Sequence, residues 1–291
     1  TIAVFRGDSV AAETCGNGLD DNSNGQTDEG CYPTGTTGVC ESPLSCGVAG
    51  AVSPDSGALV YRFAPDVTAE VAYGPSLFFQ RVYTSLYNPG YVYPSASNYK
   101  QPLGYRMQHN YMSWLTLDTV PTPDVAVVHT VTGQDVLFKY DQTAGGYAYY
   151  LPQPGFHYDY LRQATSSPYA WELRSLVGTV YKYNWSSPTG KLIEIQDSLA
   201  TPNKVTLTYN GDGQIDRVTD ATGNKYLQLE YVATDTKLLQ YVKLYADGTL
   251  SHTHKLTYTS DNLTQVQVDF AGGSPTVANY TYTSNYLVAV A

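Results

Sequence analysis

Charged side chains are scarce in this chain of 291 residues. They occupy 14% of the positions, and 26 acidic against 16 basic residues leave a net charge of −10. So few Lys and Arg residues argue against nucleic-acid binding, because such binding depends on neutralising phosphates. No apolar run reaches the roughly 18 residues that a membrane-spanning helix needs. We therefore expect neither a nucleic-acid partner nor insertion into a membrane.

The familiar signatures of catalysis are also missing. The sequence contains no Gly-x-Ser-x-Gly nucleophile motif, no His-Glu-x-x-His zinc motif and no phosphate-binding loop. Carboxylates are present, but nothing marks two of them as an acid pair for glycoside hydrolysis. His252 and His254 would share one face of a strand, where we expect a surface or cross-strand pair rather than a metal site. We therefore expect no enzyme.

Tyr is abundant, with 28 residues against seven Phe and three Trp. Aromatic and β-branched side chains suit a pleated surface, so this composition indicates β-sheet. Alternating apolar and polar positions predict strands at 58–63, 78–83, 111–117, 125–130, 136–140, 147–151 and 170–173, with a long loop at 84–103. No window shows a helical stripe. The predicted fold class is all-β: stacked β-hairpin repeats with a small disulfide-stapled loop module at the N-terminus.

All four cysteines lie near the N-terminus, at Cys15, Cys31, Cys40 and Cys46. An even number of cysteines in a loop-rich stretch indicates disulfides and hence an oxidising compartment. Of the three possible pairings, nearness along the chain favours Cys15–Cys31 with Cys40–Cys46. A zinc site is the alternative, but no Cys-x-x-Cys motif and no neighbouring His supports it. Because the sequence starts at Thr1, we expect a secreted or cell-surface protein whose signal peptide has been removed.

The loop between the first two cysteines carries oxygen-bearing side chains at alternate positions, as calcium-binding loops do. Gly25 stands at the sixth position, where such loops turn sharply, and Cys31 replaces the usual Glu at the twelfth. The expected ligands of a structural Ca²⁺ ion are Asp20, Asn22, Asn24, the carbonyl of Gln26, Asp28 and Glu29. The alternative is an Asn/Gly turn with solvated acids.

The last third of the chain repeats. An apolar-x-x-apolar pair begins at five positions spaced 23 or 24 residues apart, namely Leu192, Ile215, Leu239, Leu263 and Leu287. Each unit continues into a second segment that ends in Tyr, at Tyr209, Tyr231, Tyr258 and Tyr282. Two strands per unit predict stacked hairpins, because one hairpin alone is marginal in water and buries its apolar face against the next.

The unit at 213–224, Gly-Gln-Ile-Asp-Arg-Val-Thr-Asp-Ala-Thr-Gly-Asn, resembles the repeat of the Rhs or YD-repeat family. In that family a Gly-x-(Leu/Ile)-x-x-Val-x-Asp strand leads into a turn and a Tyr-ending strand. The unit at 190–197 is similar, whereas Leu244 and Val268 stand where the family has Asp. Upstream, the segments Phe-Gln-Arg-Val-Tyr at 79–83 and 104–111 resemble strands of the same family.

This resemblance covers roughly residues 53–291 and implies a spiral of β-hairpins, which in larger relatives forms a hollow shell around a toxin. Those relatives end in a self-cleaving core and an effector, and neither is found here, so the toxin function is not carried over. The segment 15–31 resembles a metal-binding motif of secreted bacterial proteins, with the frame Cys-Gly-(Asn/Asp)-Gly…Asp-Glu-Gly-Cys. The expected domain organisation is a strand and linker at 1–14, a Ca²⁺-binding module at 15–50, a β-rich lead-in at 51–178 and the repeats at 179–291.

The middle of the chain is crowded with aromatic residues that admit two interpretations. Cross-strand pairing in a sheet is one, and a stacking surface for surface glycans or another subunit is the other. The residues are Tyr147, Tyr149, Tyr150, Tyr158, Tyr160, Trp171, Tyr181, Tyr183 and Trp185.

Both ends of the chain read as apolar strands. The expected subunit contacts are Ile2, Val4 and Phe5 at one end and Leu287, Val288 and Val290 at the other. An uncovered apolar edge invites pairing, and the N-terminal strand of another copy could supply the missing partner. Such a contact is head-to-tail and would build an extracellular filament. The alternatives are a fragment of a longer repeat protein and a free monomer.

Overall fold

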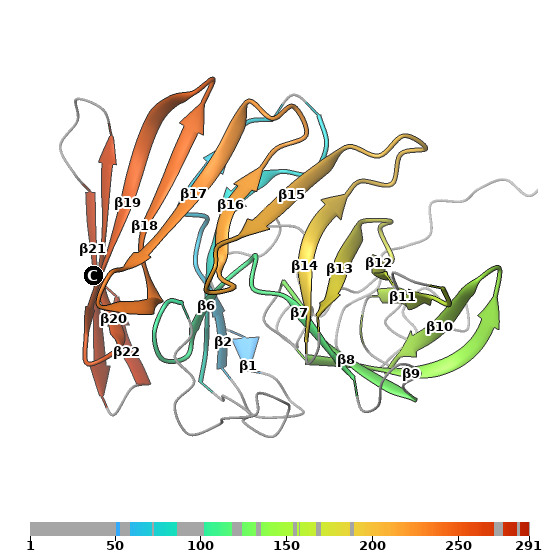
Figure 1. Cartoon of the computed structure of the whole chain (residues 1–291). Helices are drawn as coiled ribbons and strands as arrows, with labels where there is room; N and C mark the ends of the chain where they lie inside the picture. The colour runs from blue at the N-terminus through green and yellow to red at the C-terminus, as the bar shows by residue number, and fades with distance from the viewer. Residues whose placement is uncertain are drawn as a thin grey trace, which may run out of the picture.

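The computed structural model describes residues 51–52, 59–71, 73–85, 102–117, 124–131, 135–153, 156, 158–166, 170–186, 189–270, 276–283 and 286–290. Within these ranges every regular element is a strand, which confirms the all-β prediction (Figure 1). The described residues include no helix with the length and apolarity that crossing a membrane requires.

Eight consecutive strands form a closed ring. Each pairs antiparallel with the next in chain order, and the last returns to pair with the first. The strands are β7 (Trp114–Leu117), β8 (Val125–His129), β9 (Asp135–Ala144), β10 (Tyr147–Pro152), β11 (Tyr158–Ala164), β12 (Trp171–Ser175), β13 (Val180–Ser186) and β14 (Thr189–Gln196). The expected domain boundary near residue 178 therefore falls between two strands, β12 and β13, that pair with each other.

The ring is filled by side chains, because alternate residues of every strand point inward. Each strand supplies at least one residue with no more than 1% of its surface exposed. These residues are Leu115, Val128, Phe138, Tyr150, Leu161, Trp171, Tyr183 and Leu192. The interior is thus a packed core of large apolar and aromatic groups.

The sheet continues beyond the ring as an open meander. Its strands follow in chain order: β15 (Lys204–Tyr209), β16 (Ile215–Thr219), β17 (Lys225–Val232), β18 (Asp235–Ala246), β19 (Thr249–Thr259), β20 (Asn262–Phe270), β21 (Thr276–Thr283) and β22 (Tyr286–Val290). Figure 1 shows these strands fanning away from the ring towards the C-terminal end.

Strand β14 belongs to the ring and also begins the open meander, and we call this branch point the fork. One edge pairs with β13 along its whole length. The other edge is shared: Gly190 and Lys191 pair with β7, whereas 194–196 pair with β15. Because β7 and β15 leave the same edge in different directions, a gap opens between them.

Two small sheets complete the fold. One contains β1 (Ala51–Val52), β2 (Leu59–Arg62), β5 (Arg81–Thr84) and β6 (Met107–His109), and the other pairs β3 (Val67–Ala69) with β4 (Leu77–Phe79). Backbone hydrogen bonds from Tyr105 to the carbonyl of Asp261 and from Leu239 to the carbonyl of Pro102 join this region to the meander. Gly104, at φ +84°, bridges to Asn262, and a Cβ there would collide with the Asp261 carbonyl.

Arg81 ties the small sheet to the far end of the meander. Its Nε and Nη2 donate to the two carboxylate oxygens of Asp66 at 2.6 and 2.7 Å, and its Nη1 donates to the Tyr280 hydroxyl at 2.5 Å. The guanidinium also lies 4.6 Å from the ring centroid of Phe63 and 5.0 Å from that of Tyr280. Only 4% of Arg81 is exposed, so the central Arg of the 79–83 motif is a core residue.

Two of the expected strands differ in their limits. The segment 78–83 is divided between β4 and β5, which lie in different sheets, because the backbone N–H of Gln80 donates to Asn110 Oδ1 at 2.9 Å instead of joining a ladder. The strand expected at 111–117 begins only at Trp114, after a turn. Of the loop expected at 84–103, residues 86–101 lie outside the described residues.

Candidate functional site

Most of the sequence-predicted site lies outside the described residues. This holds for the four cysteines, for the expected Ca²⁺ ligands Asp20, Asn22, Asn24, Gln26, Asp28 and Glu29, and for Ile2, Val4 and Phe5. In the described part of the chain, no three His, Cys, Asp or Glu residues gather as a metal site would require. His252 and His254 have ring centroids 5.3 Å apart, and His254 is buried.

The predicted contact residues at the other end form the edge strand of the large sheet. Strand β22 pairs with β21 and has no second neighbour among the described strands. Val288 is 58% exposed, Val290 49% and Tyr286 44%, whereas Leu287 is half-buried against the core. β22 therefore presents apolar side chains beside an open backbone edge.

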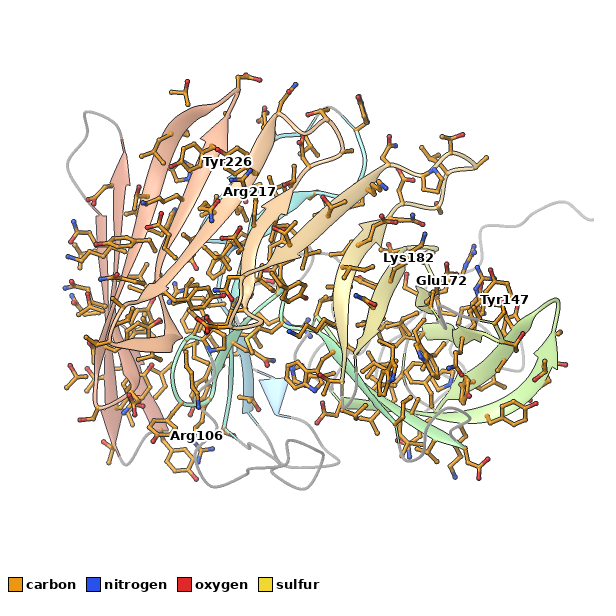
Figure 2. The ribbon with its side chains drawn as sticks, in the orientation of Figure 1. Arg106, Tyr147, Glu172, Lys182, Arg217 and Tyr226 are labelled. Atoms are coloured by element: carbon orange, nitrogen blue, oxygen red, sulfur yellow. The ribbon has the colours of Figure 1, made fainter. Side chains whose placement is uncertain are left out.

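The inner side of β22 is fixed to the small sheet. The backbone N–H of Leu287 donates to the hydroxyl of Tyr83 at 3.2 Å, and the guanidinium of Arg106 lies 4.0 Å from the ring centroid of Tyr286 (Figure 2). The edge is thus held in place at one end and open along Val288–Val290.

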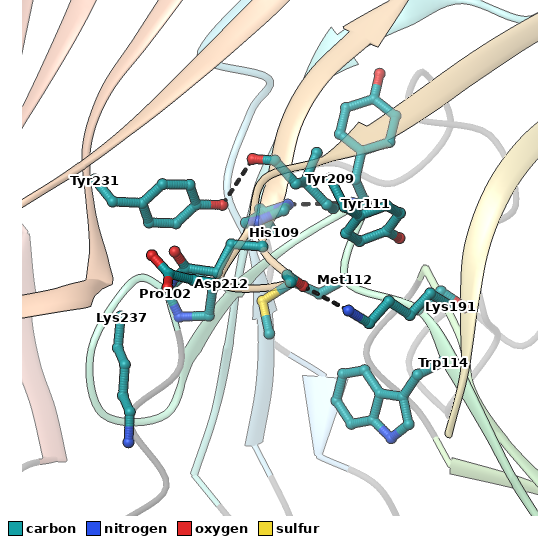
Figure 3. A pocket seen from close by; sticks show the side chains of 14 residues that line it. Pro102, His109, Tyr111, Met112, Trp114, Lys191, Tyr209, Asp212, Tyr231 and Lys237 are labelled. Carbon is teal, nitrogen blue, oxygen red and sulfur yellow. Dashed lines mark hydrogen bonds between the residues drawn. The ribbon is translucent and has the colours of Figure 1, made fainter. Parts of the chain in front are cut away.

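A second candidate is a cavity of about 310 Å³ at the fork of the large sheet. It occupies the gap between β7 and the first strands of the meander. Its walls come from the segment preceding β7, from β14 and β15, from the 210–214 turn, and from β17 and β18 (Figure 3). This volume lies at the lower end of the range for small-ligand pockets, which is about 300–1,000 Å³.

One wall is an aromatic platform. Trp114 stacks on His129, its cross-strand partner, with ring centroids 3.8 Å apart and an interplanar angle of 10°. The two ring nitrogens of His129 lie 2.6 Å from Asp135 Oδ1 and 2.8 Å from Gln108 Oε1. These contacts leave the indole little freedom to move.

A second wall carries a positive charge. Lys191 Nζ donates to the Gly213 carbonyl at 3.0 Å and lies 5.1 Å from the ring centroid of Tyr209. No carboxylate among the described residues forms an ion pair with it. Gly213, at φ +79°, brings its carbonyl to the lysine, and a side chain there would meet the ammonium. Lys237 and Asp212, both exposed, also line the cavity.

A buried histidine lies beside these groups. His109 lines the cavity and is 1% exposed. Its Nδ1 accepts from the Tyr111 N–H at 3.3 Å, so the neutral imidazole carries its proton on Nε2, which has no hydrogen-bond partner. Burial lowers the pKa of His109 to about 3, and the ring is neutral at physiological pH.

The tyrosines that end the repeat units share one contact. The hydroxyls of Tyr209, Tyr231 and Tyr258 donate to the carbonyls of Leu192, Ile215 and Leu239, at 2.5, 2.9 and 2.6 Å. Each acceptor is the first apolar residue of the same unit. Burial raises the pKa of Tyr231 and Tyr258, which keeps these donors protonated. The hydroxyl of Tyr282 is buried without a partner.

The Tyr-rich middle is divided between two faces. Tyr150, Trp171 and Tyr183 fill the ring interior, while Tyr147 and Tyr149 are half-buried. The guanidinium of Arg162 lies 4.2 Å from the ring centroid of Tyr147, and its Nε donates to Glu172 at 2.6 Å. Only some of the aromatic side chains in this Tyr-rich middle are thus available to a ligand.

Sequence reasoning did not single out the cavity. Its platform exists only because Trp114 and His129 become cross-strand partners. Lys191 on β14 meets the turn between β15 and β16, 22 residues further along the chain, and no local pattern predicts that contact. No family model matches the sequence, and no curated protein matches it.

Proposed function

We propose that the chain is a secreted structural protein of the Rhs/YD-repeat type, which assembles head to tail by adding a strand to β22. The observation that carries the proposal is the open edge of β22, with Val288 58% and Val290 49% exposed. Edge strands in proteins that stay apart are usually blunted by charge, Pro or a covering segment. Val288–Val290 has no charged residue and no Pro.

The proposed donor is the segment at 1–5, in which Ile2 and Val4 alternate with Ala3 and Phe5. A donor strand gains backbone hydrogen bonds along the edge and places alternate side chains against the apolar surface. Because donor and acceptor surfaces differ, the contact is heterologous and propagates into a filament. The rival is that the chain is a fragment of a larger Rhs/YD-repeat shell, in which a further repeat of the same polypeptide covers β22.

The repeat geometry supports the family assignment. Leu239 and Leu263 are fully buried on alternate strands, and three of the four unit-ending tyrosines repeat one hydrogen bond. In this proposal the disulfides and the Ca²⁺ ion order the 15–50 module. Glycan binding is a second candidate function, favoured by the aromatic cavity at the fork.

Electron microscopy of the purified chain tests assembly, beside a variant lacking residues 1–8 and the variant Val288→Lys. We expect filaments from the native chain and single particles from both variants, because a Lys on an edge strand opposes pairing. Leu199→Lys is the matched control: Leu199 is also 58% exposed but lies in a turn between β14 and β15. Filaments in all four samples, or in none, would contradict strand addition.

A further inference from the structure

We propose that the cavity at the fork binds an acidic sugar residue, a hexuronate of a polysaccharide, with its carboxylate at Lys191 and its ring against Trp114. This inference concerns a cavity whose lining includes no residue of β22, and it does not depend on assembly. It follows from the chemistry of three walls.

The platform suits a sugar ring. A pyranose has a face of C–H groups that packs on an aromatic plane, and aromatic side chains supply such planes with an apolar body. Trp114 is fixed by its stack on His129, whose nitrogens contact Asp135 and Gln108. A platform held in this way loses little conformational entropy when a ligand binds.

The charge favours an acid over a neutral sugar. Lys191 Nζ uses one donor on the Gly213 carbonyl, and an ammonium has three. No carboxylate of the described residues forms an ion pair with it, so a ligand carboxylate would meet an uncompensated cation. Lys237 also lines the cavity, but its side chain runs away from the centre (Figure 3). The chain as a whole carries −10, so an anion gains attraction here and not from the surface in general.

The hydroxyls of a sugar also find partners. Asp212 lines the cavity, and its carboxylate can accept hydrogen bonds from them. Inorganic phosphate would satisfy Lys191 but would leave Trp114 unused.

The test is a titration of the full chain with trigalacturonate, followed by tryptophan fluorescence and calorimetry at low ionic strength. We expect saturable binding that weakens at least ten-fold for Lys191→Met, which keeps the aliphatic stem. The matched control is Lys204→Met on β15, whose ammonium pairs with Glu194 at 3.1 Å outside the cavity. That variant should bind within two-fold of the native chain.

Two further arms identify the ligand chemistry. The neutral methyl ester of trigalacturonate should bind at least ten-fold more weakly, and Trp114→Phe should weaken both sugars. If Lys191→Met melts at a lower temperature than the native chain, Trp114→Phe replaces it as the variant that tests the cavity. The proposal is overturned by absence of saturable binding, by equal binding of acid and ester, by equal affinity of Lys191→Met and Lys204→Met, or by phosphate displacing the sugar at equal concentration. The titration is also run on Val288→Lys, which is expected to stay as single particles, so that sugar binding is measured without filaments.

Discussion

Arg81 joins the segment around Phe63 and Asp66 to strand β21 through a single side chain. It contacts the turn before β3 through Asp66 and strand β21 through Tyr280, and its guanidinium lies 4.6 Å from the ring centroid of Phe63 and 5.0 Å from that of Tyr280. A buried ion pair is of modest net value, but removal of one partner leaves the other charge buried alone. The arginine is therefore a residue on which the fold depends.

Arg81→Met should lower the free energy of unfolding by about 3–5 kcal/mol, because it strands the Asp66 carboxylate in the core. Chemical denaturation followed by fluorescence measures this change. The control is Arg217→Met, where an exposed Arg lies 4.2 Å from the Tyr226 ring and its loss should cost below about 1 kcal/mol. Equal losses for the two variants would show that Arg81 is not an anchor.

His254 should make stability depend on pH. It is 2% exposed with no hydrogen-bond partner for either ring nitrogen, and burial lowers its pKa to about 4. In the unfolded chain the pKa of this imidazole is near 6.5. Between about pH 4 and 6.5 the ring is therefore protonated in the unfolded chain and neutral in the folded chain. Stability is therefore full above pH 6.5 and falls as the pH drops through this window, levelling off below about pH 4.

Denaturation curves at a series of pH values test this effect. A fully contributing histidine gives a slope of about 1.4 kcal/mol per pH unit. His254→Leu should reduce the slope between pH 5 and 6 by that order, leaving the contributions of His109 and His252, whose pKa values burial also lowers. An unchanged slope in His254→Leu would mean that folding does not lower the pKa of His254.

At the scale of the elements, the tyrosine contact recurs from unit to unit. Tyr258→Phe removes a buried hydroxyl that donates to Leu239 and should destabilise the fold by about 1 kcal/mol. Tyr282→Phe removes a hydroxyl that has no partner and should leave stability unchanged or slightly raise it. The measurement is the thermal unfolding of the two variants. Both lose one tyrosine hydroxyl, which is hydrogen-bonded in Tyr258 and without a partner in Tyr282. A larger loss in Tyr282→Phe would contradict the hydrogen-bond pattern.

The sequence was informative about elements with regular alternation. The strands expected at 125–130, 136–140 and 147–151 correspond to β8, β9 and β10, because each alternates inward and outward side chains. Short strands such as β3 and β6 were missed, since three residues carry too few positions to show a period. The division of 78–83 was missed because it depends on Asn110, about thirty residues further along the chain.

At the scale of the whole molecule, the sequence predicted strands but not their closure. The ring depends on Gly190 and Lys191 pairing with β7, a contact between segments about 75 residues apart. Local patterns carry no signal for such a long-range pairing. The cavity follows from the same fork, which explains why neither it nor the Trp114 platform was predictable. A ladder of ion pairs runs across the neighbouring strands β11–β15 and includes Glu172 and Lys182 (Figure 2).

The central claim is that β22 accepts a strand from another copy, and amide hydrogen exchange of residues 286–290 tests it most directly. Added backbone hydrogen bonds slow exchange at an edge that is otherwise open. Leu287 already donates its N–H to Tyr83, so the test concerns the other amides of β22 that point away from β21. We predict that these amides exchange at least ten-fold more slowly in the native chain than in the variant lacking residues 1–8. Equal, fast exchange in both would contradict strand addition.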